Sequence, residues 1–80
     1  MPKLLSCDDL DTIGKRLRVC RAWKGLQLKD VAEIVGTTAQ YLSLLEHDAP
    51  GRTPSVHLLQ RLGDTYGVTS SQLLGETPLT

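Results

Sequence analysis

The sequence predicts an all-α domain made of about five short helices. Its apolar residues recur at spacings of three and four, and no segment alternates apolar and polar residues as a half-buried strand does. Turn-forming residues divide the chain into short pieces at Gly25, Gly36, 48–51 with Pro54, Gly67 and Gly75. With 80 residues, 40% of them apolar, the chain is long enough for one domain with a small core.

The first helix is expected to end near Lys24, before Gly25. Its apolar stripe consists of Ile13, Leu17 and Cys20, at positions i, i+4 and i+7. Either Ser6 with Asp9, or Thr12, can cap its N-terminus, because a hydroxyl there accepts a backbone N–H.

The next two helices are expected to be short. Residues 28–35 carry an apolar side and end at Gly36, and the following helix runs from about Thr38 to His47. Thr38 is a favourable N-cap residue, and Leu42 and Leu45 are expected to face the core.

Two further helices complete the predicted bundle. One begins at Pro54-Ser55 and is expected to bury an apolar set at helical spacing: Val56, Leu59, Leu62 and Tyr66. The last fits residues 70–74, with Thr69 or Ser70 as its cap.

Charge is distributed unevenly along the chain. Nine basic and nine acidic residues give a net charge of zero, but residues 12–29 hold six bases and no acid. One face can therefore be positive and attract a polyanion, although a solvated basic helix is the alternative. No apolar run reaches the roughly 18 residues that cross a bilayer, so no membrane association is expected. Two cysteines and an acidic start without a secretory signal favour the cytoplasm.

Two short helices joined by about three residues around a glycine are typical of a helix-turn-helix motif. The motif and its flanks read IGKRLRVCRAWKGLQLKDVAEIVGTTAQYLSLLEH and then TPSVHLLQRLGDTYGVTSSQLL. Over residues 13–74 the sequence resembles the Cro and phage-repressor family of helix-turn-helix regulators. The resemblance implies a compact five-helix, lambda-repressor-like DNA-binding domain over residues 12–75, between an N-terminal extension (1–11) and a short tail (76–80).

The resemblance also implies the function, a sequence-specific transcriptional regulator that reads double-stranded DNA. We expect a repressor that binds a palindromic operator as a homodimer, with helix 38–47 in the major groove. A helical wheel places the side of that helix opposite Leu42 outward, where it would meet the groove. The residues expected to touch DNA are Gln27, Lys29, Thr37, Thr38, Gln40, Tyr41, Ser43, Leu44, Arg52 and Thr53. Arg16 and Lys24 are further candidates for phosphate contacts.

Four residues are expected to hold the motif together. In the family the positions of Arg21 and Glu46 are paired, so we expect a two-pronged, partly buried ion pair. Ala32 lies where the two motif helices cross, because only a small side chain allows close approach there. Gly36 lies where the turn needs a positive φ, which glycine adopts without steric cost.

The sequence departs from the family pattern at several positions. Gln27 and Leu28 stand where Thr or Ser and then Gln usually contact phosphate, and helix 38–47 has no Lys or Arg. Leu44 can touch a thymine methyl group or belong to a protein-binding patch. Trp23 either packs against the N-terminal extension through Leu4, Leu5 or Leu10, or contacts another protein.

A helix-turn-helix module used for protein–protein interaction is therefore the alternative function. Dimerisation is expected through the C-terminal helices, where the spare apolar residues are Val68, Leu73, Leu74 and Leu79. If the chain is complete, it is a stand-alone regulator without a second, ligand-sensing domain.

Other kinds of site are not supported by the sequence. The two histidines and two cysteines lack metal-ligand spacings, and no pattern of a catalytic nucleophile or paired carboxylates is present. We therefore expect no enzyme activity, metal, cofactor or small-molecule ligand. Cys20 is expected to be a buried apolar residue, and Cys7 an inert thiol rather than a redox-sensitive one.

Overall fold

A computed structural model describes residues 12–78 and contains five helices in that range. They are α2 (Ile13–Lys24), α3 (Leu28–Val35), α4 (Ala39–Glu46), α5 (Val56–Tyr66) and α6 (Ser70–Leu74). The all-α prediction is confirmed, and the predicted helix limits agree with the observed ones to within a residue or two. Within the described residues, none of the helices has the length and hydropathy of a membrane-spanning segment.

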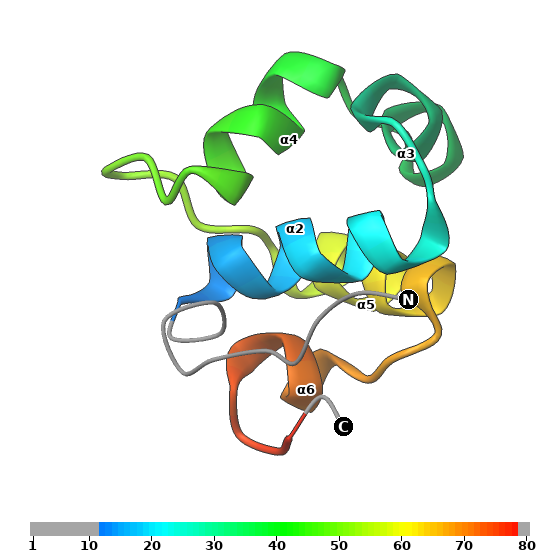
Figure 1. Cartoon of the computed structure of the whole chain (residues 1–80). Helices are drawn as coiled ribbons and strands as arrows, with labels where there is room; N and C mark the ends of the chain where they lie inside the picture. Colours follow the sequence, from blue (N-terminus) through cyan, green and yellow to red (C-terminus); the bar gives the residue numbers. More distant parts are fainter. Residues whose placement is uncertain (1–11, 79–80) are drawn as a thin grey trace.

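The helices form a small bundle around α2. In Figure 1, α3 and α4 lie above α2, α5 runs behind it, and α6 lies below. The helix α4 packs on both α2 and α3, and α5 packs on both α3 and α6. The arrangement leaves the outer sides of α3 and α4 on one face of the molecule.

The core is formed mainly by aliphatic side chains. Its buried apolar members are Leu17, Cys20, Val31, Ala32, Val35, Leu42, Leu45, Leu59, Leu62, Tyr66 and Leu73. Every helix contributes at least one of them, so each short helix is stabilised by packing rather than by its own propensity. Cys20, 1% exposed, is the buried apolar residue expected from the sequence, whereas Cys7 lies outside the described residues.

Four of the described helices begin at a hydroxyl cap, and the sequence predicts three of these caps, at Thr12, Thr38 and Thr69. The side-chain oxygen of the residue before the helix accepts a backbone N–H from the first turn at Thr12, Thr38, Ser55 and Thr69. The α2 helix is capped by Thr12, which is one of the two predicted alternatives. Ser6 and Asp9, the other, lie outside the described residues.

Two burial predictions were wrong. Val56 was expected in the core but is 70% exposed at the first residue of α5, whereas Leu59 in the same turn is buried. Leu73 was expected to supply spare apolar surface, yet it is fully buried in the core between α6 and the rest of the bundle. The exposed apolar residue of α6 is Leu74, at 46%.

Candidate nucleic-acid interface

The turn between α3 and α4 depends on Gly36. Its φ of 82° lies in the left-handed region, which glycine adopts without a steric cost. The N–H groups of Gly36 and Thr37 both donate to the carbonyl oxygen of Ala32, each at 2.9 Å. The chain thus leaves α3 and enters α4 within three residues, and the side chain of Ala32 is buried beside this turn.

The N-terminal half of α4 presents polar groups to solvent. Thr38 Oγ1 accepts the N–H of Tyr41 at 3.1 Å, which leaves its own O–H available as a donor. Gln40 is exposed, whereas Thr37, Tyr41 and Ser43 are half-buried. Such groups can donate to and accept from base edges or phosphate oxygens.

The C-terminal half of α4 is held in place by Leu42 and Leu45, which are 3% and 2% exposed. Leu44, one residue from Leu45, is half-buried rather than fully outward, so only part of its side chain is available for contact. At the end of α4, exposed His47 carries its Nδ1 at 2.7 Å from the carbonyl oxygen of Ser43.

The expected ion pair between Arg21 and Glu46 is present. Arg21 Nε donates to Glu46 Oε2 at 2.7 Å, and Arg21 Nη2 donates to Glu46 Oε1 at 3.0 Å. Its Nη1 donates to the carbonyl oxygen of Leu26 at 3.0 Å, just after α2. The hydrogen bond to Glu46 is the main reason why the pKa of Arg21 is raised. One guanidinium therefore joins the end of α4 to α2 and to the start of the α2–α3 loop.

The start of α3 carries less donor capacity than the family pattern implies. Gln27 and Lys29 are exposed, and Leu28 is half-buried against the core. The carboxylate of Asp30 accepts the backbone N–H of Gln27 at 3.2 Å, so a negative group already lies at this helix end. A phosphate here would meet Lys29 and the Gln27 side chain, with Asp30 opposing it.

The loop from His47 to Ser55 supplies the remaining candidates. Arg52 and Thr53 are both exposed, and Pro54 is buried directly after them. The N–H of Arg52 donates to the carbonyl oxygen of Ala49 at 3.1 Å, which makes the tip of the loop a tight turn. The buried Pro54 anchors the loop directly after this pair of residues.

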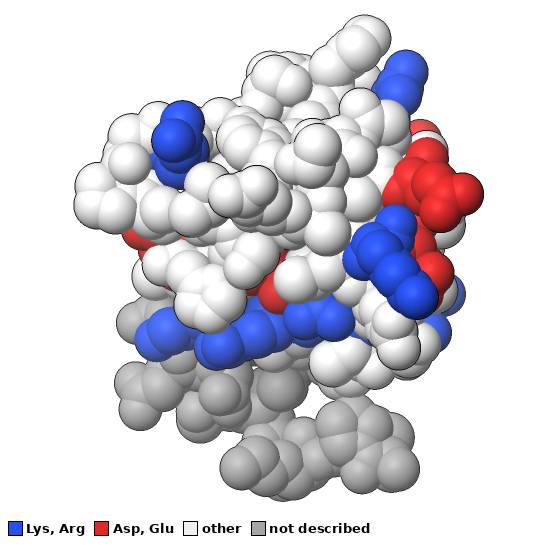
Figure 2. Space-filling view, turned by 90° about the horizontal axis from the view of Figure 1, so that it is seen from above, with Lys and Arg blue, Asp and Glu red and all other residues white. Residues whose placement is uncertain are grey.

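The α3–α4 face is largely uncharged. Figure 2 looks onto this face and shows uncharged residues across its middle, with Lys and Arg mainly at its margins and acidic groups gathered at one side. This agrees with α4 itself, whose sequence AQYLSLLE has no base. Any attraction to a polyanion must therefore come from the rim of the face.

Arg16, a candidate phosphate contact in the sequence analysis, is directed toward α6 instead. Its Nη1 donates to the carbonyl oxygen of Leu73 at 3.2 Å, and its guanidinium also lies against Gly75. The side chain thus holds α6 on α2, because α6 has unpaired carbonyl groups at its C-terminus. Lys24, the other extra candidate, is exposed at the end of α2.

Two contacts near the motif were missed by the sequence analysis. Arg61 Nη1 donates to the carbonyl oxygen of Val35 at 3.1 Å and so stabilises the end of α3. The carboxylate of Asp48 binds the first turn of α2 through Thr12 and Gly14. The sequence could have indicated the contact of Asp48, because it has an aspartate, not a glycine, where α4 ends.

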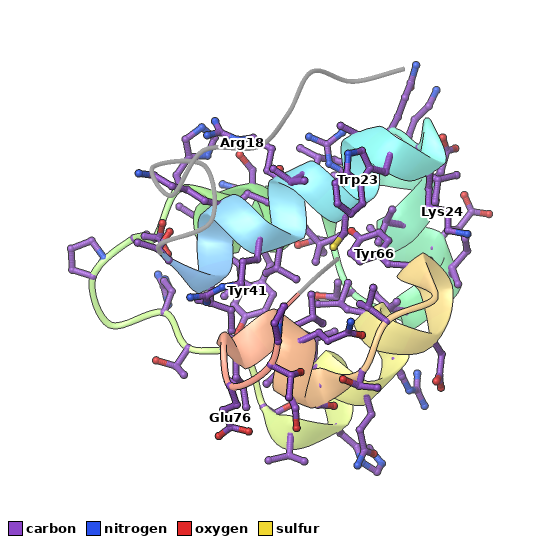
Figure 3. The ribbon with its side chains drawn as sticks, turned by 60° about the horizontal axis from the view of Figure 1, so that its bottom comes forward. Arg18, Trp23, Lys24, Tyr41, Tyr66 and Glu76 are labelled. Carbon is purple, nitrogen blue, oxygen red and sulfur yellow. The ribbon has the colours of Figure 1, made fainter. Side chains whose placement is uncertain are left out.

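Trp23 and Tyr66 differ in their surroundings. Figure 3 shows Trp23 projecting from the C-terminal part of α2, whereas Tyr66 lies inside the bundle. Trp23 is 37% exposed and Tyr66 is 5% exposed. The predicted partners of Trp23, Leu4, Leu5 and Leu10, lie outside the described residues, so that interpretation stays a prediction.

The chain is similar to known regulators along most of its length. A family model described as a helix-turn-helix domain matches residues 12–74. The HTH-type transcriptional regulator DdrOP3 of Deinococcus deserti is 48% identical over 61 residues, which are 75% of this chain and 45% of that protein. The chain spans less than half the length of the curated relatives it matches.

Solved structures share the same arrangement of helices. The N-terminal DNA-binding domain of SinR from Bacillus subtilis has a TM-score of 0.70 and 31% identity, with 76% of this chain and 87% of that chain covered. The P22 c2 repressor, solved in complex with a synthetic operator, has a TM-score of 0.74 and 20% identity, with 82% and 97% covered. At that identity the second likeness shows the fold alone.

Proposed function

The chain belongs to the helix-turn-helix domain family of transcriptional regulators, and from this premise we propose that it is a sequence-specific DNA-binding regulator. In this proposal α4 enters the major groove, and the α4–α5 loop and the start of α3 contact phosphates on either side. The observation that carries it is the α3–turn–α4 unit, in which Gly36 orients α4 while its polar side is left exposed.

The DNA contacts in this proposal divide into two classes. Base edges would be read by the outward side of α4, above all by Gln40, which is exposed and can donate and accept together. Phosphates would be met by exposed Lys29, Arg52 and Thr53 and by the hydroxyls of Thr37 and Thr38. Few cations are available, so specificity would depend on base contacts more than on charge.

We further propose a homodimeric repressor that acts on a palindromic operator in the cytoplasm. A two-fold dimer presents two copies of α4, which must lie about 34 Å apart to enter successive major grooves on one side of the duplex. The apolar surface of α6, with Leu74 46% exposed, supports a dimer contact at the C-terminal end. The likeness to the N-terminal DNA-binding domain of SinR supports the DNA-binding part of this proposal.

A protein-interaction module is the second candidate. Ile34 and Val56 are 60% and 70% exposed, which is high for large apolar side chains on so small a domain. Their chain neighbours Val35 and Ser55 line a shallow cleft with Leu58 and Arg61 between the α3–α4 turn and α5. The exposed side chains of Ile34 and Val56 would suit an apolar segment of a protein partner.

Selection from a random duplex library followed by fluorescence anisotropy at about 50 mM salt tests the first candidate. We expect an enriched sequence that the chain binds more tightly than a scrambled duplex. Gln40→Glu should abolish this preference, because it places a carboxylate where base edges and phosphates approach. Gln60→Glu makes the same charge change at an exposed position of α5 and should leave binding unchanged. If the folded chain binds no duplex, the interaction module is favoured instead.

A further inference from the structure

The end of α4 differs from the ends of the other four helices. Each of those is followed by a glycine with a positive φ, between 66° and 84°: Gly25, Gly36, Gly67 and Gly75. At the corresponding place after α4 the chain has Asp48, with φ 54°. Among the described residues, it is the non-glycine residue with a positive φ.

Asp48 occupies a position at which glycine is preferred. The N–H of Asp48 donates to the carbonyl oxygen of Leu45, and the N–H of Ala49 donates to that of Leu44, both at 3.1 Å. This pair of bonds is the Schellman ending of a helix, whose left-handed residue is most often glycine. An aspartate adopts the same conformation at some steric cost, so its side chain must provide something that glycine does not.

The carboxylate of Asp48 reaches across to the start of α2. Its Oδ2 accepts the hydroxyl of Thr12 at 2.6 Å, and its Oδ1 accepts the backbone N–H of Gly14 at 3.0 Å. A helix N-terminus has N–H groups without partners in the helix and a partial positive charge, both of which favour a carboxylate. Asp48 therefore satisfies an N–H of α2 while it ends α4.

The backbones of the two helices approach closely at this contact. A Cβ atom on Gly14 would lie 2.5 Å from the carbonyl oxygen of Leu45 and 2.7 Å from Cγ of Asp48. No side chain fits between them, and the hydrogen bonds of Asp48 join α2 and α4 at this close approach. Two residues earlier, Glu46 binds Arg21 farther along α2.

We propose that Asp48 is a positioning residue for DNA reading, and this inference rests on the proposed function. Leu42 and Leu45 hold α4 on the core, and the Arg21–Glu46 pair fixes its last residue at one polar point on α2. The Asp48 contact adds a second point near the N-terminus of α2, which fixes the orientation of α4. Asp48 also lies at the start of the loop that carries Arg52 and Thr53. Base readout requires placement to within about 0.5 Å, so loss of this second point should reduce discrimination between sequences.

Two substitutions at Asp48 separate its side chain from its backbone conformation. Asp48→Gly removes both hydrogen bonds but gives α4 the same ending residue as the other helices, and Asp48 is exposed, so the variant should fold. Asp48→Asn keeps an oxygen for the N–H of Gly14, places an NH₂ group against Thr12 and tolerates a positive φ. Thr12→Val is a second variant, which removes the hydroxyl partner of Asp48 together with the N-cap bond that this hydroxyl accepts from Lys15. Trp23 fluorescence during urea unfolding checks that each variant folds.

The experiment measures affinity for the selected duplex and for a scrambled duplex of the same composition. We expect Asp48→Gly to weaken binding to the selected duplex about tenfold while changing binding to the scrambled duplex less than about twofold. Asp48→Asn should restore the wild-type ratio, and Thr12→Val should lower the ratio by a smaller factor. Amide hydrogen exchange at Gly14 should become faster in Asp48→Gly and remain slow in Asp48→Asn.

Three results would overturn the inference. They are an unchanged ratio in Asp48→Gly, an equal loss on both duplexes, and a loss in Asp48→Asn as large as in Asp48→Gly. Failure of the proposed function looks different, because the wild-type chain would then bind no duplex or would not discriminate between them. In that case the positioning role of Asp48 is contradicted as well. Amide hydrogen exchange at Gly14 still reports whether the carboxylate of Asp48 binds the start of α2.

Discussion

Arg21 and Glu46 join α2 to the last residue of α4 by two parallel hydrogen bonds of 2.7 Å and 3.0 Å. Glu46 is 5% exposed, and it is the buried charged residue among those the structure describes. A buried carboxylate is costly unless it is paired, so the pair requires α4 to stay at this place on α2. The same guanidinium also binds the carbonyl oxygen of Leu26.

Removal of the charge on Glu46 should destabilise the fold. In Glu46→Gln the guanidinium of Arg21 keeps at most one acceptor on that side chain besides the carbonyl oxygen of Leu26, and the free energy of unfolding should fall by about 2–3 kcal/mol. Urea unfolding followed by Trp23 fluorescence measures this. Glu33→Gln, an exposed position on α3, is the control and should change stability by less than about 0.5 kcal/mol. A loss for Glu46→Gln as small as that of the control would contradict the assigned role.

Stability should fall in alkaline solution because of Cys20. Burial raises the pKa of its thiol from the ordinary value of 9.0 to about 11. The thiol of the unfolded chain ionises first, so the folded state binds more protons and the free energy of unfolding falls as the pH rises from 9 to 11. Burial also raises the pKa of Tyr66, which acts in the same direction.

Urea unfolding between pH 8 and pH 11 measures the effect of Cys20. Cys20→Ala is the matched variant, and its stability should decline less steeply over this range because it has no thiol to ionise. Identical slopes for the two proteins would assign the alkaline loss to other groups, Tyr66 among them.

Base readout should depend on Gln40. Its exposed amide can pair in two-pronged fashion with adenine or donate to guanine, so Gln40→Ala should cost about 1–3 kcal/mol on the selected duplex and little on random DNA. Anisotropy titrations on both duplexes measure the difference, with Gln60→Ala on α5 as the control. Equal losses on both duplexes would show that Gln40 contacts phosphate.

Binding to DNA should depend only moderately on salt. The candidate cations are few: Lys29 and Arg52 are exposed, exposed Lys24 lies beside Gly67 at the end of α5, and Arg16 and Arg21 are engaged within the protein. Two to three phosphate contacts per subunit predict a slope of log K against log salt near −4 to −5 for a dimer. A slope steeper than about −8 would show that more of the basic residues reach the DNA.

The dimer contact is predicted at α6. Leu74→Lys places a charge on the exposed apolar residue of that helix and should shift the protein toward monomer in sedimentation experiments. Val56→Lys, at a more exposed apolar position on α5, should leave the dimer intact. The opposite pattern would place the contact at the N-terminus of α5, and a monomer at tens of micromolar with and without DNA would contradict the dimer.

The sequence alone predicted the helices because the signals involved are local. The spacing of Leu17 and Cys20 defines a buried stripe. The side-chain oxygen of Thr38 accepts a backbone N–H in the first turn of α4, and Gly36 permits the left-handed turn. Each signal depends on residues within one or two helical turns, so the order and limits of the helices follow from it.

The pair Arg21–Glu46 came from the resemblance to a known family, since nothing local shows that two residues 25 positions apart meet. The helical wheel gave the outward side of α4, and the resemblance gave the expectation that this side reads DNA. The resemblance gave no information on the positions at which this chain differs from the family pattern.

Contacts between distant segments were decided only by the tertiary structure. The first turn of α5 leaves Val56 exposed, Leu73 fills the core beneath α2, and Arg16 is drawn to the end of α6. Asp48 binds Gly14 across 34 positions of sequence. Burial depends on which helix covers a residue, and the choice of partner for a charged group depends on which backbone N–H or carbonyl remains unsatisfied nearby. Both are properties of how the helices are packed, whereas helical periodicity and capping are already set by the order of the residues.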